Sequence, residues 1–151
     1  MPKTVVLDST PLGQLCDPRT RPGPVACRRW VADMLAAGHR FFVPEIADYE
    51  IRRELLRLGN ANSIAALDAL APQPGIGYLP LTRDIMRRAA ELWAFARQTG
   101  QPTAGDNTID ADMILIAQAE SLNDPGAVIA TGNVGHLARF FPADLWSNIV
   151  P

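Results

Sequence analysis

The sequence predicts an α/β fold, a three-layer α/β/α sandwich around a mostly parallel sheet of four to five strands. Short apolar runs of strand length alternate along the 151 residues with longer segments whose apolar residues recur at helical spacing. Such alternation is typical of parallel sheets, in which crossover helices join the strands. No repeat, low-complexity tract or linker interrupts the pattern, so one domain is expected over residues 1–151.

Five segments have the length and composition of strands. The first contains the continuous apolar run Val5-Val6-Leu7, as expected of a strand that is covered on both faces. Pro80 indicates that the third strand lies at a sheet edge, because proline cannot donate a hydrogen bond to a neighbouring strand. The predicted strands are residues 3–7, 40–43, 77–81 and 127–130, with a last edge strand at 146–150.

Helical periodicity and end signals predict the connecting segments. Gly38 and Gly59 each follow a periodic run and are expected to end a helix. Loops are expected at residues 17–24 and 100–105. In the first half of the chain, the predicted helices are one that starts at Pro11 with Ser9 or Thr10 as its cap, residues 25–37, residues 44–58, and one capped by Asn62 or Ser63 that ends at Pro72. A helix over residues 83–98 is expected to be capped by Thr82, with Ile85, Ala89, Leu92, Trp93 and Ala96 facing inward. The last two predicted helices run from Asp106 or Thr108 to about Ser121 and, as a short helix, from Asn133 to about Phe140.

Composition and charge exclude several classes of protein. No apolar run approaches the roughly 20 residues of a membrane span, and Met-Pro-Lys-Thr leads directly into a strand, which leaves no room for a signal peptide. Cys16 and Cys27 lack metal-ligand spacing and are expected to be reduced thiols in a cytoplasmic protein. The net charge of −2 gives no global basic field, so a polyanionic substrate would need a local basic patch or a metal ion.

Polar side chains lie where predicted strands give way to helices, or on helix flanks. Asp8 ends the first strand, Asn133 and Thr131 follow the fourth, Glu50 lies one to two turns into a helix, and Asp112 interrupts an apolar helical run. Ligands bind beyond the carboxyl ends of parallel strands, so these groups are expected to meet at one sheet edge. Three carboxylates in one pocket repel each other unless a hard cation lies between them, which predicts a magnesium-dependent nuclease.

Each of these residues also has a purely structural interpretation. Asp8 could cap the helix at Pro11, Glu50 could be a surface partner of a nearby arginine, and Asn133 could cap a helix. Asp112 borders an apolar face and therefore requires a partner. Asp110 could be a second acidic contributor or a charge that stabilises the helix N-terminus.

Four segments together resemble the PIN domain, and more narrowly the VapC-like toxin ribonucleases of prokaryotic toxin–antitoxin systems. The segments are residues 5–12, 44–55, 110–119 and 130–137. The resemblance implies that the metal-binding acids are Asp8, Glu50 and Asp112, that Asn133 completes the catalytic set, and that Thr10, Asp110 and Thr131 support it. Many members of the family carry Asn where this chain has Thr10, and Asn133 occupies a place that is often Asp.

The same resemblance implies a function. It implies Mg²⁺- or Mn²⁺-dependent hydrolysis of RNA phosphodiester bonds by the toxin of a type II toxin–antitoxin pair, with an antitoxin protein as partner, a homodimeric state and no membrane contact. Candidate RNA-binding residues are Arg52, Arg53 and Arg57, with Arg19, Arg21, Arg28 and Arg29 near the first loop, and His136 could contact a phosphate. Apolar side chains around Trp30, Met34, Ile64 and Leu67 are expected to form either the core or a homodimer or antitoxin surface.

Other readings of the same residues are open. Asp8-Ser9-Thr10 after a strand is similar to a haloacid-dehalogenase-type phosphatase, but that class needs an acid at position 10 and a lysine, and Lys3 is the sole lysine. A receiver-like phosphoacceptor domain meets the same objection. The remaining alternative is a catalytically degenerate PIN-like module that binds RNA or a protein without cleavage, which Asn133 and Thr10 would favour.

Overall fold

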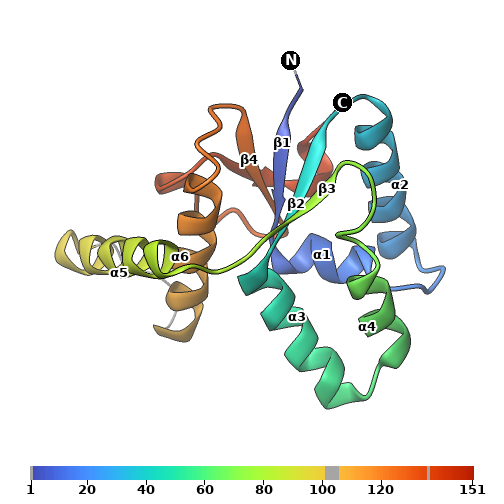
Figure 1. The fold of residues 1–151 in the computed structure, drawn as a ribbon, viewed down its shortest axis with the longest axis horizontal. Helices are drawn as coiled ribbons and strands as arrows, with labels where there is room; N and C mark the ends of the chain where they lie inside the picture. Colours follow the sequence, from blue (N-terminus) through green and yellow to red (C-terminus); the bar gives the residue numbers. More distant parts are fainter. Residues whose placement is uncertain (1, 101–105, 136) are drawn as a thin grey trace.

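The fold is built on a five-stranded parallel sheet with the strand order β3-β2-β1-β4-β5 (Figure 1). The computed structural model describes residues 2–100, 106–135 and 137–151, with the side chains of residues 106–109 outside the description. The predicted loop at 100–105 and His136 therefore lie largely or wholly outside the described residues. The strands are β1 (Thr4–Leu7), β2 (Arg40–Pro44), β3 (Ile76–Leu79), β4 (Ala127–Thr131) and β5 (Ala143–Leu145).

Helices connect the strands on both faces of the sheet. They are α1 (Ser9–Leu15), α2 (Pro22–Ala36), α3 (Glu45–Leu58), α4 (Ala61–Asp68), α5 (Arg83–Gln98) and α6 (Asp106–Glu120), with 3₁₀ turns at Leu137–Arg139 and Trp146–Asn148. The predicted end signals of two helices are confirmed. Thr82 Oγ1 accepts a hydrogen bond from the Ile85 amide at 3.1 Å, and Gly59 ends α3 in the left-handed conformation at φ 66°.

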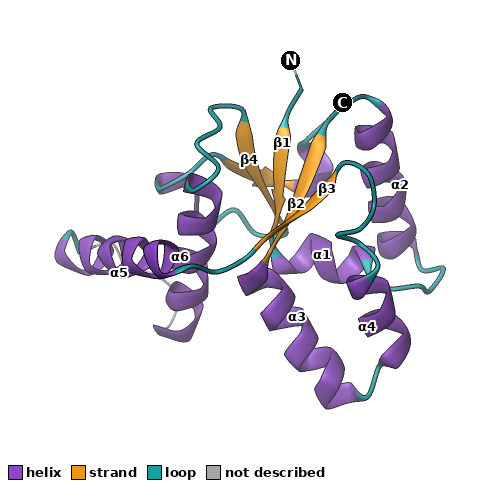
Figure 2. Ribbon diagram, in the orientation of Figure 1, coloured by secondary structure: helices purple, strands orange, loops and turns teal. Residues whose placement is uncertain are grey.

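Alternate residues of the strands contribute to two separate cores. Val5 and Leu7 of β1 pack with side chains of α1, α2, α3 and α4, whereas Val6 of β1 and Ile129 of β4 pack with α5 and α6. Figure 2 shows the strands between these groups of helices, with α5 and α6 on one side and α2 and α4 on the other. The predicted three-layer α/β/α sandwich is therefore confirmed, and all of its strand pairs are parallel.

The prediction for the last strand was wrong. The edge strand β5 is the short segment Ala143–Leu145, and the apolar segment that follows it belongs to the core. Trp146 packs on Trp30 with ring centroids 5.4 Å apart, and the Ile149 carbonyl accepts a hydrogen bond from Trp30 Nε1 at 2.7 Å. The apolar composition of this segment reflects packing against α2 rather than strand pairing.

Several helix ends also differ from the prediction. Asp8, rather than Ser9 or Thr10, caps α1, and Asn60, rather than Asn62 or Ser63, caps α4. Helix α2 starts at Pro22 instead of Val25, because proline is favoured in the first helical turn, where its missing N–H costs nothing.

Two further expectations were wrong in detail. Of the short helix expected from Asn133, the described residues contain only the 3₁₀ turn Leu137–Arg139. Trp93, expected to face inward, is 39% exposed on α5, although the other predicted inward residues of that helix are buried.

The sequence left four apolar side chains as either core or interface residues, and three of them belong to the core. Trp30, Met34 and Leu67 are buried, and Ile64 is half-buried. Cys16 and Cys27 are buried free thiols, and burial raises the pKa of each to about 12. Among the described helices, none is both long and apolar enough to cross a bilayer.

Candidate active site

One pocket lies at the carboxyl edge of the sheet and contains most of the predicted site residues. Its volume is about 280 Å³, and it is lined by Asp8, Ser9, Thr10, Glu50, Arg53, Ala111, Asp112, Thr131, Asn133 and Leu137. The strand order explains this convergence. Leu7 of β1 pairs with Ala130 of β4, so the residues that follow these strands emerge side by side. Glu50 and Asp112 come from the second turns of α3 and α6, helices that contact each other.

Asp8 caps α1 and also lines the pocket, so its capping role is compatible with a place in the candidate site. Its Oδ1 accepts a hydrogen bond from the Ser9 amide at 2.7 Å and so caps α1. Its Oδ2 accepts a hydrogen bond from the Thr131 hydroxyl at 2.8 Å. Each carboxylate oxygen has two lone pairs, so these bonds orient Asp8 and still leave it able to bind a further ligand.

Thr131 links the ends of the two neighbouring strands. Its hydroxyl donates to Asp8 and accepts a hydrogen bond from the Asn133 amide at 3.2 Å. Thr131 is buried, while the side chain of Asn133 is exposed at the pocket. The backbone amide of Asn133 therefore helps to fix the hydroxyl that holds Asp8, and its side-chain amide remains available to the pocket.

The pocket holds an excess of negative charge. Burial, together with the nearby Asp8 and Glu50, raises the pKa of Asp112 to about 7. Burial and Asp8 also raise the pKa of Glu50, and Arg53 partly offsets this rise. The three carboxyl groups thus affect one another electrostatically, and a cation between them would lower the cost of ionising all three.

The donor set of the pocket fits a hard cation. The lining contains carboxylate, amide and hydroxyl oxygens and no described His or Cys, which favours Mg²⁺ or Mn²⁺ over zinc. Among the described residues, no three His, Cys, Asp or Glu side chains form a ready-made chelating cluster. Mg²⁺ does not require one, because it usually keeps several waters and binds one or two carboxylates directly.

Gly132 is a site residue that the sequence analysis missed. A Cβ atom at this position would lie 2.5 Å from Thr10 Cγ2, so only glycine allows Thr10 to pack against the turn after β4. The available signal was a glycine between two polar residues directly after a strand. Thr10 itself lines the pocket, as the motif placed it.

Gln118 is a second missed residue, and it connects the elements that carry the acids. Its Oε1 accepts a hydrogen bond from the Ile46 amide at 3.2 Å, and its Nε2 donates to the Leu79 carbonyl at 2.7 Å. Gln118 is fully buried. It therefore ties α6 to the start of α3 and the end of β3, and a lone glutamine within an apolar helical run was the signal for it.

Asp110 does not join the other acids. It lines a separate apolar pocket between α5 and α6 with Met86, Trp93, Met113 and others. Asp112, two residues further along α6, lines the pocket of Asp8 and Glu50. The helical phase of α6 thus separates the two aspartates: Asp112 lines the candidate site, as the motif placed it, and the supporting place expected for Asp110 was wrong.

The predicted RNA-binding arginines have different surroundings. Arg53 lines the acidic pocket, whereas Arg52 forms ion pairs with Asp48 and Asp68, each at 2.7 Å, and Arg57 pairs with Glu54. Around the first loop, Asp17 holds the other basic side chains: Arg19 and Arg21 pair with its carboxylate and Arg28 donates to its carbonyl, while Arg29 is exposed.

The family model of the PIN domain matches residues 5–137 of this chain. This match bears out the resemblance that the four motifs predicted. A search of curated proteins found no match.

Solved structures of the same fold cover almost the whole chain. A complex of VapBC2 from Rickettsia felis, bound to a DNA fragment from its promoter, superposes with a TM-score of 0.70 at 14% identity and covers 95% of this chain and 98% of the other. VapBC-1 from nontypeable Haemophilus influenzae superposes with a TM-score of 0.65 at 19% identity and covers 96% of this chain and 99% of the other. VapC20 from Mycobacterium tuberculosis, a sarcin–ricin loop cleaving toxin, gives 0.65 at 14% identity, covering 97% and 99%. At these identities the likeness concerns the fold, and the structures are those that the narrower VapC-like resemblance predicts.

Proposed function

The chain belongs to the PIN domain family, and from this premise we propose that it is a metal-dependent endoribonuclease that hydrolyses RNA phosphodiester bonds. Members of this family are nucleases that generally use divalent metal ions. The observation that carries the proposal is the convergence of Asp8, Glu50 and Asp112 on one pocket, with the pKa of Asp112 raised to about 7 and that of Glu50 also raised. Groups with such shifts in a pocket are typical of functional sites.

Asp8 and Asp112 are the proposed ligands of the ion. Asp8 is oriented by the Ser9 amide and the Thr131 hydroxyl, and Asp112 is carried by a helix that Gln118 anchors. When bound, Mg²⁺ or Mn²⁺ would lower the pKa of a coordinated water and neutralise charge on the scissile phosphate. Asn133 and Thr10 would orient waters around the ion through hydrogen bonds.

Glu50 is the proposed acceptor of the proton from the attacking water. It lines the pocket beside the proposed ligands, and an ionised carboxylate there would accept a proton from a nearby water. Arg53, on the same helix, would donate hydrogen bonds to a phosphate oxygen and offset the charge of the pocket. The leaving oxygen of the RNA would take a proton from water, because the described lining contains no His or Lys to supply one.

The proposed biological context is a toxin–antitoxin pair. Support comes from the fold shared with VapBC complexes and with VapC20, whose described target is RNA. An antitoxin partner, a homodimer, a cytoplasmic location and a single functional domain over residues 1–151 stay predictions. A small reading frame beside the gene would support the antitoxin, and its co-expression with this chain, followed by copurification and mass measurement, tests the first two.

A degenerate, non-cleaving module is the second candidate. Asn133 in place of a fourth acid, Thr10, and the lack of a preformed three-acid chelate among the described residues favour it. Such a module would bind RNA or a protein through the same pocket without hydrolysis.

One experiment distinguishes the two candidates. The purified protein is incubated with a structured RNA and Mg²⁺ or Mn²⁺, and cleavage is followed by gel electrophoresis. If the chain is the proposed enzyme, it cleaves the RNA in the presence of metal, a chelator abolishes the cleavage, and the Asp8→Ala variant is inactive. Cleavage that persists in Asp8→Ala indicates a contaminating nuclease, and binding without cleavage at any metal concentration supports the degenerate module.

A further inference from the structure

We propose that Tyr49 and Arg53 form a stacking platform beside the acidic pocket that holds an unpaired base of single-stranded RNA next to the scissile phosphate. This inference rests on the proposed function, because it names the form of substrate that the same pocket takes. It adds a residue, Tyr49, that neither the motifs nor the pocket lining identify.

Arg53 connects the platform with the pocket. Among the described residues that line the pocket, Arg53 is the only one with a positive charge. Its guanidinium carbon lies 5.2 Å from the centre of the Tyr49 ring, within the range of a cation–π interaction. The two residues are one helical turn apart on α3, so their side chains lie on the same face of the helix.

Arg53 differs from its neighbours on α3 in its charge partners. Arg52 is neutralised by Asp48 and Asp68, and Arg57 pairs with Glu54. Within the described part of the chain, Arg53 forms no ion pair, so its guanidinium can donate hydrogen bonds to a phosphate without first breaking one. Its cation–π contact with Tyr49 restricts the positions of the guanidinium and so reduces the entropy that a phosphate contact would cost.

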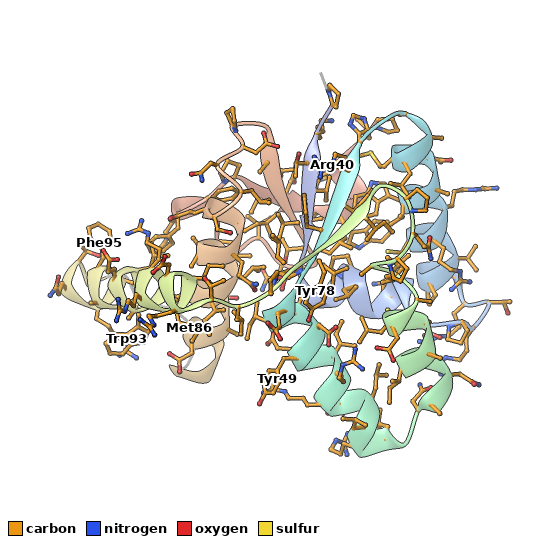
Figure 3. All side chains as sticks on the ribbon, viewed as in Figure 1. Arg40, Tyr49, Tyr78, Met86, Trp93 and Phe95 are labelled. Atoms are coloured by element: carbon orange, nitrogen blue, oxygen red, sulfur yellow. The ribbon has the colours of Figure 1, made fainter. Side chains whose placement is uncertain are left out.

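Tyr49 presents an aromatic surface to solvent at the same place. The residue is 55% exposed, and its side chain projects from α3 on the side where α6 lies (Figure 3). Two other arginine–aromatic pairs occur in the described structure, Arg40 with Phe42 and Arg97 with Trp93, but none of these four residues lines the acidic pocket. The Tyr49–Arg53 pair is thus the one beside the proposed chemistry.

The chemistry of the platform selects unpaired nucleotides. Bases stack on aromatic rings and on guanidinium planes only when they are splayed out of a helix, as in loops, bulges and single strands. A base stacked on Tyr49 would leave its adjoining phosphate near Arg53 and the three carboxyl groups. Tyr49 and Arg53 are therefore assigned as the residues that position an unpaired nucleotide beside the cleaved bond.

The test separates binding from cleavage. A single-stranded oligoribonucleotide that carries 2-aminopurine is titrated with the full chain in the presence of EDTA, and its fluorescence and anisotropy are recorded. Stacking on Tyr49 is expected to quench the fluorescence, Tyr49→Leu to abolish the quenching and weaken binding about tenfold, and Tyr49→Phe to bind within about twofold of the wild type. Arg53→Gln is expected to weaken binding and lower its salt dependence.

Matched controls and a kinetic readout complete the design. Tyr78→Leu removes an exposed tyrosine of β3 that lines a different pocket, and Arg57→Gln removes an arginine of α3 outside the acidic pocket; both are expected to bind like the wild type. With Mn²⁺ present, Tyr49→Leu should raise KM about tenfold and change kcat less than about threefold.

Each outcome bears on the platform or on catalysis separately. No quenching with the wild type, or equal binding by Tyr49→Leu and the wild type, overturns the platform even if the wild type cleaves RNA. Tyr49-dependent quenching without any cleavage supports the platform and instead overturns the proposed catalysis. Equal loss of binding to a perfect duplex and to a single strand in Tyr49→Leu overturns the selection for unpaired bases.

Discussion

Two groups of acidic residues include side chains from different faces of α3, and they differ in how their negative charges are balanced. In the first, Asp48 and Asp68 share Arg52, whose guanidinium donates to both carboxylates. In the second, Asp8, Glu50 and Asp112 meet around a pocket where the charge of Arg53 only partly offsets theirs, and the pKa values of Glu50 and Asp112 are raised. In the first cluster, Arg52 pairs with both carboxylates. The second cluster is the proposed site of an external cation.

The comparison teaches that burial of acids is not by itself a sign of function. Asp48 is as buried as many core residues, yet an arginine one turn away on the same helix neutralises it. The candidate functional cluster is distinguished by the raised pKa values of Glu50 and Asp112 and by its place at the carboxyl edge of a parallel sheet.

The largest expected effect is on catalysis. Asp112→Asn keeps the shape of the side chain but removes a proposed ligand, and we expect kcat on RNA to fall by about 10²–10³-fold, the scale on which single electrostatic groups act in active sites. Asp110→Asn changes the same residue type two positions away, in a different pocket, and should retain activity within about twofold. Equal losses in the two variants would contradict the assignment of Asp112.

Metal binding should stabilise only the protein with an intact pocket. At Mn²⁺ concentrations about 100 times Kd, mass action adds about 2.7 kcal/mol to the free energy of unfolding. For a domain of this size that corresponds to a rise in Tm of several degrees, measured by calorimetry. Asp8→Ala should lose most of this rise, and Arg52→Ala should keep it; a rise that survives in Asp8→Ala would indicate binding elsewhere.

The Arg52 cluster should affect stability rather than activity. Arg52→Ala leaves the buried Asp48 without its partner, and we expect unfolding in urea to require about 1–3 kcal/mol less than in the wild type. Arg57→Ala breaks an exposed pair and should change stability by less than about 1 kcal/mol. Loss of RNA cleavage in folded Arg52→Ala, beyond the change in stability, would show that this cluster also serves the substrate.

A separate expected effect is a dependence of stability on pH in the absence of metal. The pKa of Asp112 is about 7 in the folded state, above its ordinary value of 3.8, so the folded protein binds more protons than the unfolded chain between these values. The free energy of unfolding contributed by this group therefore falls as pH rises from about 4 to 7. Urea unfolding with EDTA at several pH values should reveal this slope, and Asp112→Asn should flatten it. An unchanged slope in that variant would assign the dependence to other groups.

Much of the fold was predictable because local signals and tertiary packing agree. The continuous apolar run of β1, the Thr82 cap and the apolar stripe of α5 each have one interpretation, and the structure confirms them except for the exposed Trp93. The edge strand β5 was missed because three residues are too few to show strand periodicity, while Trp146, which follows it, packs on Trp30.

The candidate site was predictable to the level of which strand ends carry it. β1 and β4 are parallel neighbours, so the residues at their carboxyl ends, Asp8 and Thr131, lie at the same edge of the sheet. Their proximity therefore follows from the order of the strands. The partners of individual arginines do not follow, since Arg52 and Arg53 are adjacent in sequence and differ only in the face of α3 that each occupies. For the same reason, the motif favoured Asp112 as the metal-binding acid but did not reveal that Asp110 faces a different pocket.

The buried amide of Gln118 has a consequence for how a cation would be received. Because one end of this amide accepts from the Ile46 backbone and the other donates to the Leu79 backbone, sliding or rotation of α6 against α3 would break hydrogen bonds that no water could replace in the interior. Gln118 therefore holds α6 in place against the start of α3, the two helices that carry Asp112 and Glu50, and this contact needs no ion. The site would thus be largely preorganised for a cation, and little of the free energy of binding would be offset by ordering of the chain.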